Sequence, residues 1–247
     1  MLPRFFVPDL DPDGGPIALP PDEARHLTRV LRLSAGDEVA VFDGRGHEFR
    51  ARVVSATRDR VQLDRLAPIA PAPESRVPLT LVQAVLKGDK MDAVVRDATM
   101  MGVTAIEPVI TARTIGRLQA LESGRASERW RRVAVASAKQ CRRATVPAIA
   151  DGRSFADWLP AGGAGTRVIL VEPSAGGGDE PSLRFLETHA PASLSLLVGP
   201  EGGWSPEERQ QAEAAGCLAV TLGGITLRAD AVAVAAIAIV RFVLRDL

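Results

Sequence analysis

Two glycine-rich corners carry the residues whose types and spacing could do chemistry. The first corner, LVGPEGGWSPEE, holds Glu201, and the second, LGGITLRAD, ends on Arg228 and Asp230. An arginine can stabilise negative charge that develops in a reaction, and a carboxylate can accept a proton or orient the arginine. These three residues are therefore the catalytic candidates. The simpler alternative is that Arg228 pairs with Asp230 or a helix end and that Asp230 only caps the helix that follows.

The first corner differs from the two familiar glycine-rich phosphate sites. It lacks the G-K-[ST] of the P-loop and the G-x-G-x-x-G of dinucleotide-binding folds. One such corner alone is consistent with an ordinary tight turn. Two corners, following the buried apolar runs 194–198 and 218–222, instead predict one shared pocket, because ligands of open α/β sheets lie outside the carboxyl ends of the strands.

The elements around these corners follow a β-α-β pattern. An apolar run over residues 79–87 predicts a strand, and apolar residues at helical spacing between Asp89 and Gly102 predict a helix. Residues 103–110 predict a second, parallel strand. A further strand over 166–173 would bring a third strand end to the pocket. Helices are expected from about 127 to 141, after the cap Ser205-Pro206 with its capping-box glutamate, and from about 230 to 244.

The first part of the chain has a different pattern. A helix is expected over residues 21–33, and three strands of alternating polarity within 38–66, with a hairpin turn at Asp43-Gly44. The proline-rich segment 67–78 forbids a continuing central strand or helix. We therefore expect a small β domain over residues 1–73 and an α/β domain over 74–247.

Composition limits the class of protein. The 247 residues are 46% hydrophobic and 24% charged, which is typical of a soluble globular protein. Apolar runs are too short to span a membrane and the N-terminus lacks a signal-peptide core, so a cytoplasmic location without membrane association is expected. Two cysteines and three histidines make a metal site improbable.

The net charge of zero conceals a basic segment. Residues 76–150 carry 13 Lys and Arg against six Asp and Glu. Such a block predicts a face that binds a polyanion, although a solvated helix face is an equal alternative. The candidate phosphate contacts are arginines at helical spacing in two predicted helices: Arg25, Arg29 and Arg32 in the first, and Arg129, Arg132 and Arg143, on the same side as Lys139, in and just after the second.

Taken in order, five segments resemble one family along nearly the whole chain. They are LRLSAGDEVAVFDGRG, KGDKMDAVVRDATMMGV, KQCRRATVP, LVGPEGGWSPEE and LGGITLRADAVAVAA. The set is similar to the SPOUT-superfamily methyltransferases that methylate N3 of a uridine in 16S, small-subunit ribosomal RNA. The family's R-T-E-T pattern reads Arg228-Ala229-Asp230-Ala231 here, and its Glu-Gln before the basic pair reads Lys139-Gln140.

The resemblance implies a fold, a cofactor and partners. The fold is a PUA-like RNA-binding barrel followed by an α/β domain with a trefoil-knotted parallel sheet and helices on both faces. The partners are a second copy of the chain and ribosomal RNA, in an assembled or assembling 30S particle, with no metal. Three strand-end loops would hold S-adenosylmethionine through Val171, Glu172, Val198, Gly199, Gly202, Leu222, Gly223, Ile225 and Leu227.

Elementary chemistry agrees with these residue types. Methyl transfer from a sulfonium removes its positive charge, so alignment is the main requirement. Loss of the N3 proton spreads negative charge onto O2 and O4 of uracil, which Arg228 could stabilise while Glu201 or Asp230 accepts the proton or orients the arginine. Two alternatives remain: a non-catalytic RNA-binding ribosome assembly factor that retains fold and pocket, and a methyltransferase acting on transfer RNA.

Overall fold

The computed structural model describes residues 2–114, 124–162, 165–173, 181–189 and 191–246. Contacts divide the chain into two compact units. The first comprises Met1–Glu74 and Val135–Val146, and the second comprises Ser75–Ala134 and Pro147–Leu247. The sequence suggested a single division after residue 73, whereas the first unit also includes a segment from the middle of the chain.

The first unit is built on a five-stranded sheet. Its described strands pair in the open order β1 (Arg4–Phe6), β3 (Glu38–Phe42), β4 (Glu48–Ala56), β5 (Val61–Pro68) and β2 (Ile17–Ala18). Alternation puts one face of the sheet in the core, where Phe5, Val39, Val53 and Leu63 meet Leu27. The small β domain and its three central strands are confirmed, while the two short edge strands were missed.

Two local predictions in this unit need correction. The helix expected over 21–33 is α1 (Pro21–Arg25) followed by a π-helical turn, η1 (His26–Val30), and Arg32 has a left-handed φ of 57°. The hairpin after Phe42 is also longer than the expected turn. Asp43 Oδ1 accepts the backbone N–H groups of Arg45 and His47, so an aspartate-centred loop joins β3 to β4.

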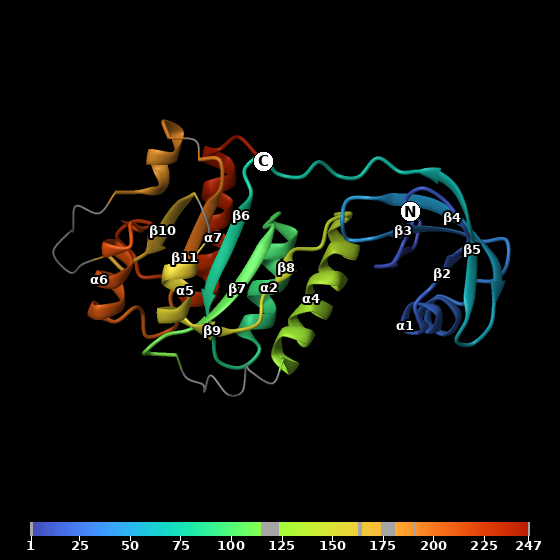
Figure 1. Ribbon diagram of the computed structural model, residues 1–247, viewed down its shortest axis with the longest axis horizontal. Helices are drawn as coiled ribbons and strands as arrows, with labels where there is room; N and C mark the ends of the chain where they lie inside the picture. The colour runs from blue at the N-terminus through green and yellow to red at the C-terminus, as the bar shows by residue number, and fades with distance from the viewer. Residues whose placement is uncertain (1, 115–123, 163–164, 174–180, 190, 247) are drawn as a thin grey trace. The chain divides into compact units, whose positions relative to one another are not determined.

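The second unit contains a parallel sheet in the order β12-β10-β11-β6-β7-β8, with β9 also paired to β7 (Figure 1). Because the ladder is parallel, β10, β11 and β12 end at the same edge of the sheet. The strand bounds are β6 Leu79–Ala84, β7 Ala105–Ile110, β8 Ala148–Ile149, β9 Arg153–Ser154, β10 Thr166–Leu170, β11 Leu194–Val198 and β12 Leu218–Val220.

Helices lie on both faces of this sheet. The cluster of Val82, Ile169 and Leu197 includes side chains of α5 and α6, while α7 packs on β11 and on α2. The α/β fold with a flanked parallel sheet is therefore confirmed, and the trefoil knot stays a prediction. The bounds are α2 Lys90–Met100, α4 Arg125–Cys141, α5 Phe155–Ala161, the 3₁₀ turn η2 Leu183–Glu187, α6 Pro206–Ala214 and α7 Ala229–Val243.

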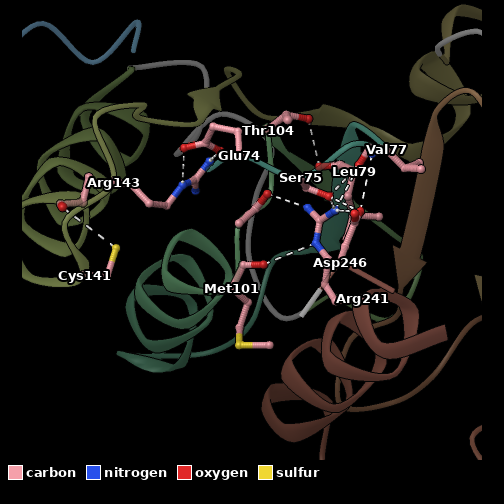
Figure 2. A network of polar contacts seen from close by, with 12 residues as sticks. Glu74, Ser75, Val77, Leu79, Met101, Thr104, Cys141, Arg143, Arg241 and Asp246 are labelled. Atoms are coloured by element: carbon pink, nitrogen blue, oxygen red, sulfur yellow. Dashed lines mark hydrogen bonds and ion pairs between the residues drawn. The ribbon is translucent and has the colours of Figure 1, made fainter. Parts of the chain in front are cut away.

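A buried arginine fixes the last helix. Arg241 on α7 is 1% exposed and donates to the carbonyl oxygens of Met101 and Gly102, which end α2, and to that of Val77 (Figure 2). Asp246 Oδ2 lies 3.4 Å from its guanidinium. These bonds satisfy carbonyl oxygens just past the end of α2 and hold the last turn of α7 against that end of the helix.

The largely apolar stretch 229–240 predicts a last helix that is buried on every side, and this is wrong for the single chain. Phe242 is 75% exposed and Ile239 is 38% exposed, whereas Ala233, Ile237 and Val240 are buried. Among the helices that the structure describes, none is long and apolar enough to cross a membrane.

Candidate active site

A cavity of about 680 Å³ lies at the edge of the sheet where three strands end. Its walls come from the loops after β10, β11 and β12 and from the first turns of α2, α6 and α7. Pockets of this size accommodate a cofactor-sized ligand. The two glycine corners therefore share one cavity, as their spacing predicted.

Trp204 joins two of the three strand ends. Its indole Nε1 donates to Leu170 O at 2.9 Å, and its ring packs 4.9 Å from that of Phe155. A Cβ added at Gly199 would lie 3.2 Å from Trp204 Nε1, so the ring occupies the space that a side chain there would need. The glycine thus allows the corner after β11 to approach the end of β10 closely.

Glu208 also holds the corner after β11 in place, through hydrogen bonds from two different segments. Its Oε2 accepts the Ser205 N–H at 3.0 Å while Ser205 Oγ accepts the Glu208 N–H, which confirms the predicted capping box. The second carboxylate oxygen, Oε1, accepts the Ala112 N–H at 2.7 Å. One side chain therefore starts α6 and also attaches the loop after β7 to it.

Arg228 and Asp230 form the first charged pair of the site. Arg228 is the N-cap of α7, and its Nε and Nη2 donate to the two carboxylate oxygens of Asp230 at 3.2 and 3.1 Å. The simpler alternative is correct in that Arg228 pairs with Asp230, but Asp230 lies in the first helical turn and does not cap the helix. The Arg228 side chain is 74% exposed and lines the cavity, so the pair presents a planar donor to it.

Glu201 and Lys90 form the second charged pair. Lys90 Nζ donates to Glu201 Oε1 at 2.7 Å, and the Lys87 N–H donates to the same oxygen at 3.3 Å. Burial raises the pKa of Glu201, but the hydrogen bonds from Lys90, from its own backbone and from Lys87 outweigh it and hold the pKa below the ordinary value. The carboxylate is therefore ionised at neutral pH, a state suited to holding Lys90 rather than storing a proton.

The structure places the remaining predicted residues in two groups. Seven of the nine residues predicted for the cofactor line the cavity: Val171, Glu172, Val198, Gly199, Leu222, Ile225 and Leu227. Gly202 and Gly223 lie outside the lining. Gly223 adopts a left-handed φ of 122° in the last loop, and Gly202 faces Arg113. Their glycine character serves backbone shape, which is a different requirement from contact with a ligand.

Sequence reasoning missed several cavity residues. Lys90 and Arg113 line the cavity, as do Trp204 and Arg209. The same strand-end rule that identified the glycine corners could have found the first two, because Lys90 follows β6 and Arg113 follows β7. Thr226, in the loop after β12 that also carries Ile225, and Val232, on α7, line the cavity as well.

The arginines predicted for RNA contact belong to both units. In the first unit Arg25 and Arg29 are exposed on α1 and η1, and Arg32 is exposed beyond them. Arg143 is different: it lies past the end of α4, is 6% exposed and pairs with Glu74 at 2.5 Å. The idea that it shares an exposed helix side with the others is therefore wrong.

In the second unit Arg132 is exposed on α4, while Arg129 is held by carboxylates of α2 and the turn before it. Its guanidinium lies 3.0 Å from Asp89 Oδ1 and 2.5 Å from Asp92 Oδ2. Asp89 occupies the N-cap position of α2, but its side chain accepts a hydrogen bond from Arg129 and makes no capping bond. The role of all these arginines toward RNA stays a prediction. In the part of the chain that the structure describes, there is no group of three His, Cys, Asp or Glu suited to a metal ion.

The fold and the cavity are those of an RNA methyltransferase domain. The model of that family matches residues 73–241, and the model of the RNA methyltransferase PUA domain matches residues 19–64. Among curated proteins, the ribosomal RNA small subunit methyltransferase E of Mycobacterium bovis is 31% identical over 245 residues, which is 96% of this chain and 90% of that protein. The Synechocystis sp. protein of the same name is 32% identical over 216 residues, 86% of this chain and 68% of its own.

A solved structure agrees with these relatives. The crystal structure of ribosomal RNA small subunit methyltransferase E from Neisseria gonorrhoeae, bound to S-adenosyl methionine, is 31% identical, with a TM-score of 0.84 and coverage of 98% of each chain. The chain belongs to the ribosomal RNA small subunit methyltransferase E family.

Proposed function

We propose that this protein transfers the methyl group of S-adenosylmethionine to N3 of a uridine in small-subunit ribosomal RNA. The observation that carries the proposal is the single cavity formed by three strand-end loops, with the Arg228 donor at its edge. Membership of the family supports S-adenosylmethionine as the cofactor and small-subunit ribosomal RNA as the substrate. The choice of N3 of a uridine as the methylated atom rests on the resemblance seen in the sequence. A cytoplasmic location is part of this proposal, because ribosomal RNA is its substrate.

The residues present fit this cofactor. Ile225 is 79% exposed and Leu227 is 39% exposed at the cavity, so an apolar ligand surface such as adenine would cover them. The carboxylates of Glu172 and Glu201 also line the cavity and suit a positively charged ligand. When bound, the cofactor supplies an electrophilic methyl group on a sulfonium.

This chain's own side chains would then prepare the base. The Arg228 guanidinium can donate hydrogen bonds to a uracil carbonyl oxygen and stabilise the negative charge that this oxygen gains once N3 loses its proton. Asp230 holds the guanidinium plane, because it engages Nε and Nη2 together. Glu201 stays ionised and positions Lys90, so the N3 proton passes to solvent water, which reaches the exposed Arg228 side of the cavity.

A second copy of the chain is part of the proposal. The exposed side of α7, with Ile239 and Phe242 one helical turn apart, is a surface that a partner would bury. The substrate is proposed to be the RNA within a small ribosomal particle.

The test uses purified protein, radiolabelled cofactor and small ribosomal subunits from cells that lack this gene. Label is expected in the small-subunit RNA, with calorimetric cofactor binding that persists when a chelator is present. Cofactor binding without any label in RNA would instead favour the non-catalytic assembly factor, and label only in transfer RNA would favour the third alternative.

A further inference from the structure

Four basic side chains line the cavity, Lys90, Arg113, Arg209 and Arg228, together with the carboxylates Glu172 and Glu201. Glu213 and Asp230, which lie outside the lining, pair with Arg209 and Arg228. The positive charge that could meet an anionic ligand therefore comes mainly from Lys90 and Arg113. If the proposed function holds, the anion that enters with the target base is an RNA phosphodiester.

Two of these cations are attached to successive residues of the corner after β11. Lys90 Nζ lies 2.7 Å from Glu201 Oε1, and Arg113 Nη1 donates to Gly202 O at 2.8 Å. The other two are engaged by carboxylates of their own segments, since Arg209 pairs with Glu213 at 2.8 Å and Arg228 with its neighbour on α7. Lys90 and Arg113 therefore contact neighbouring residues of this corner from two different segments, the start of α2 and the loop after β7.

The position of Arg113 is fixed by its backbone as well as by its guanidinium. The preceding residue, Ala112, donates its N–H to Glu208 Oε1 at 2.7 Å. A Cβ at Gly202 would lie 3.2 Å from Arg113 Cβ, which is tighter than an ordinary contact. This close approach accounts for a glycine at a position that does not line the cavity. The arginine is thus held at the rim before any ligand arrives, which lowers the entropy lost on binding.

We propose that Lys90 and Arg113 form a clamp for a phosphodiester group next to the target nucleotide. One Arg113 nitrogen is committed to Gly202 O, while the guanidinium fork carries five N–H donors that match phosphate geometry. Lys90 adds a compact positive charge whose position is set by Glu201. The clamp positions the RNA backbone, and the proposed base contact at Arg228 is separate from it.

The experiment compares Arg113→Gln, Lys90→Gln and the double variant, each loaded with S-adenosylmethionine. The probe is the small ribosomal subunit from cells that lack this gene. Each single variant is expected to raise the half-saturating subunit concentration about tenfold, the size of one lost charged hydrogen bond. Each should also reduce the slope of log affinity against log salt by roughly 0.7 to 0.9. The single-turnover rate at saturation and the calorimetric cofactor affinity should change little, and Arg113→Lys should recover part of the affinity.

The matched control is Arg96→Gln, which removes one charge from the same helix as Lys90. Arg96 pairs with Asp97 and lies outside the cavity lining. Salt slopes of the clamp variants equal to that of the control would overturn the clamp, as would a loss of cofactor affinity in place of RNA affinity. Filter binding measures the slope without turnover. A wild-type protein that binds subunits but transfers no methyl group would therefore refute the proposed function while the slopes still decide the clamp.

Discussion

Arg228 and Asp230 are joined side-on across the first turn of α7, with Nε and Nη2 of the arginine on the two carboxylate oxygens. The pair is solvent-accessible on the arginine side, where 74% of the side chain is exposed. Exposed ion pairs contribute little to stability. The arrangement therefore matters mainly for the direction in which the guanidinium faces the cavity.

The first prediction concerns this donor. Arg228→Lys keeps the charge but loses the planar fork, so single-turnover methyl transfer should fall by ~100-fold or more, the size of removing one oxyanion donor. Calorimetric cofactor affinity should stay nearly normal. Transfer at close to the wild-type rate would remove Arg228 from the mechanism.

The matched variant Asp230→Asn separates orientation from proton transfer. Asparagine retains one acceptor for the guanidinium, so the loss should be smaller than for Arg228→Lys, with little change in melting temperature. A loss as large as that of Arg228→Lys would instead identify Asp230 as the group that accepts the proton.

The second prediction follows from the lowered pKa of Glu201. Burial acts to raise this pKa, and the hydrogen bonds from Lys90 and the backbone more than reverse it. The carboxylate is therefore ionised at any pH above the ordinary glutamate pKa of about 4.3. It should not titrate between about pH 6 and pH 9. The pH profile of single-turnover transfer should have the same shape for wild type and Glu201→Gln. A limb that disappears in the variant would show that Glu201 is the base.

The third prediction concerns the buried pair of Arg241 and Asp246, whose side chains are 2% and 3% exposed. Arg241→Met leaves a buried carboxylate without its cation and should reduce the free energy of unfolding by about 3 to 5 kcal/mol. Adding Asp246→Asn should recover part of that loss. Urea unfolding of wild type and the two variants measures the difference, and equal stabilities of the single and double variants would contradict it.

The same pair predicts a pH dependence. Burial raises the pKa of Asp246, but the hydroxyl of Ser75, the N–H groups of Arg76 and Val77 and the charge of Arg241 together hold it below its ordinary value. A lowered folded-state pKa stabilises the protein above the unfolded pKa of about 3.9 and loses that contribution as pH falls through the folded value. The stability gap between wild type and Asp246→Asn should therefore close below about pH 4. A constant gap would refute the assignment.

The fourth prediction tests the second copy of the chain. Phe242→Asp places a charge on the exposed side of α7, where Phe242 is 75% exposed in the single chain. Light scattering at micromolar concentration should give a dimeric mass for wild type and a lower mass for the variant. A monomeric wild-type mass would contradict the proposed dimer.

Local physical signals in the sequence predicted much of the second unit. The apolar run 194–198 became β11 with every residue buried, and Ser205 and Glu208 formed both bonds of the capping box. The shared cavity followed from a general property of parallel sheets, whose strands end at one edge. These features depend on neighbours within a few residues or on a rule of topology.

Pairings between distant segments could not be predicted in this way. Glu201 meets Lys90 across 111 positions, and Glu208 reaches Ala112 across 96. Both contacts depend on the order β11-β6-β7, which periodicity does not determine. Arg143 was misplaced for the same reason, because its partner Glu74 is 69 positions away. The knot is a property of the whole path of the chain, and only the family resemblance suggests it.

The central claim is methyl transfer to N3 of a uridine in small-subunit ribosomal RNA. The most direct measurement is to map modified uridines by mass spectrometry in small-subunit RNA from cells with and without this gene, and with Arg228→Lys in its place. The account predicts one N3-methyluridine that is present with the wild-type gene and lost or strongly reduced in the other two. An identical set of modified uridines in all three strains would contradict it.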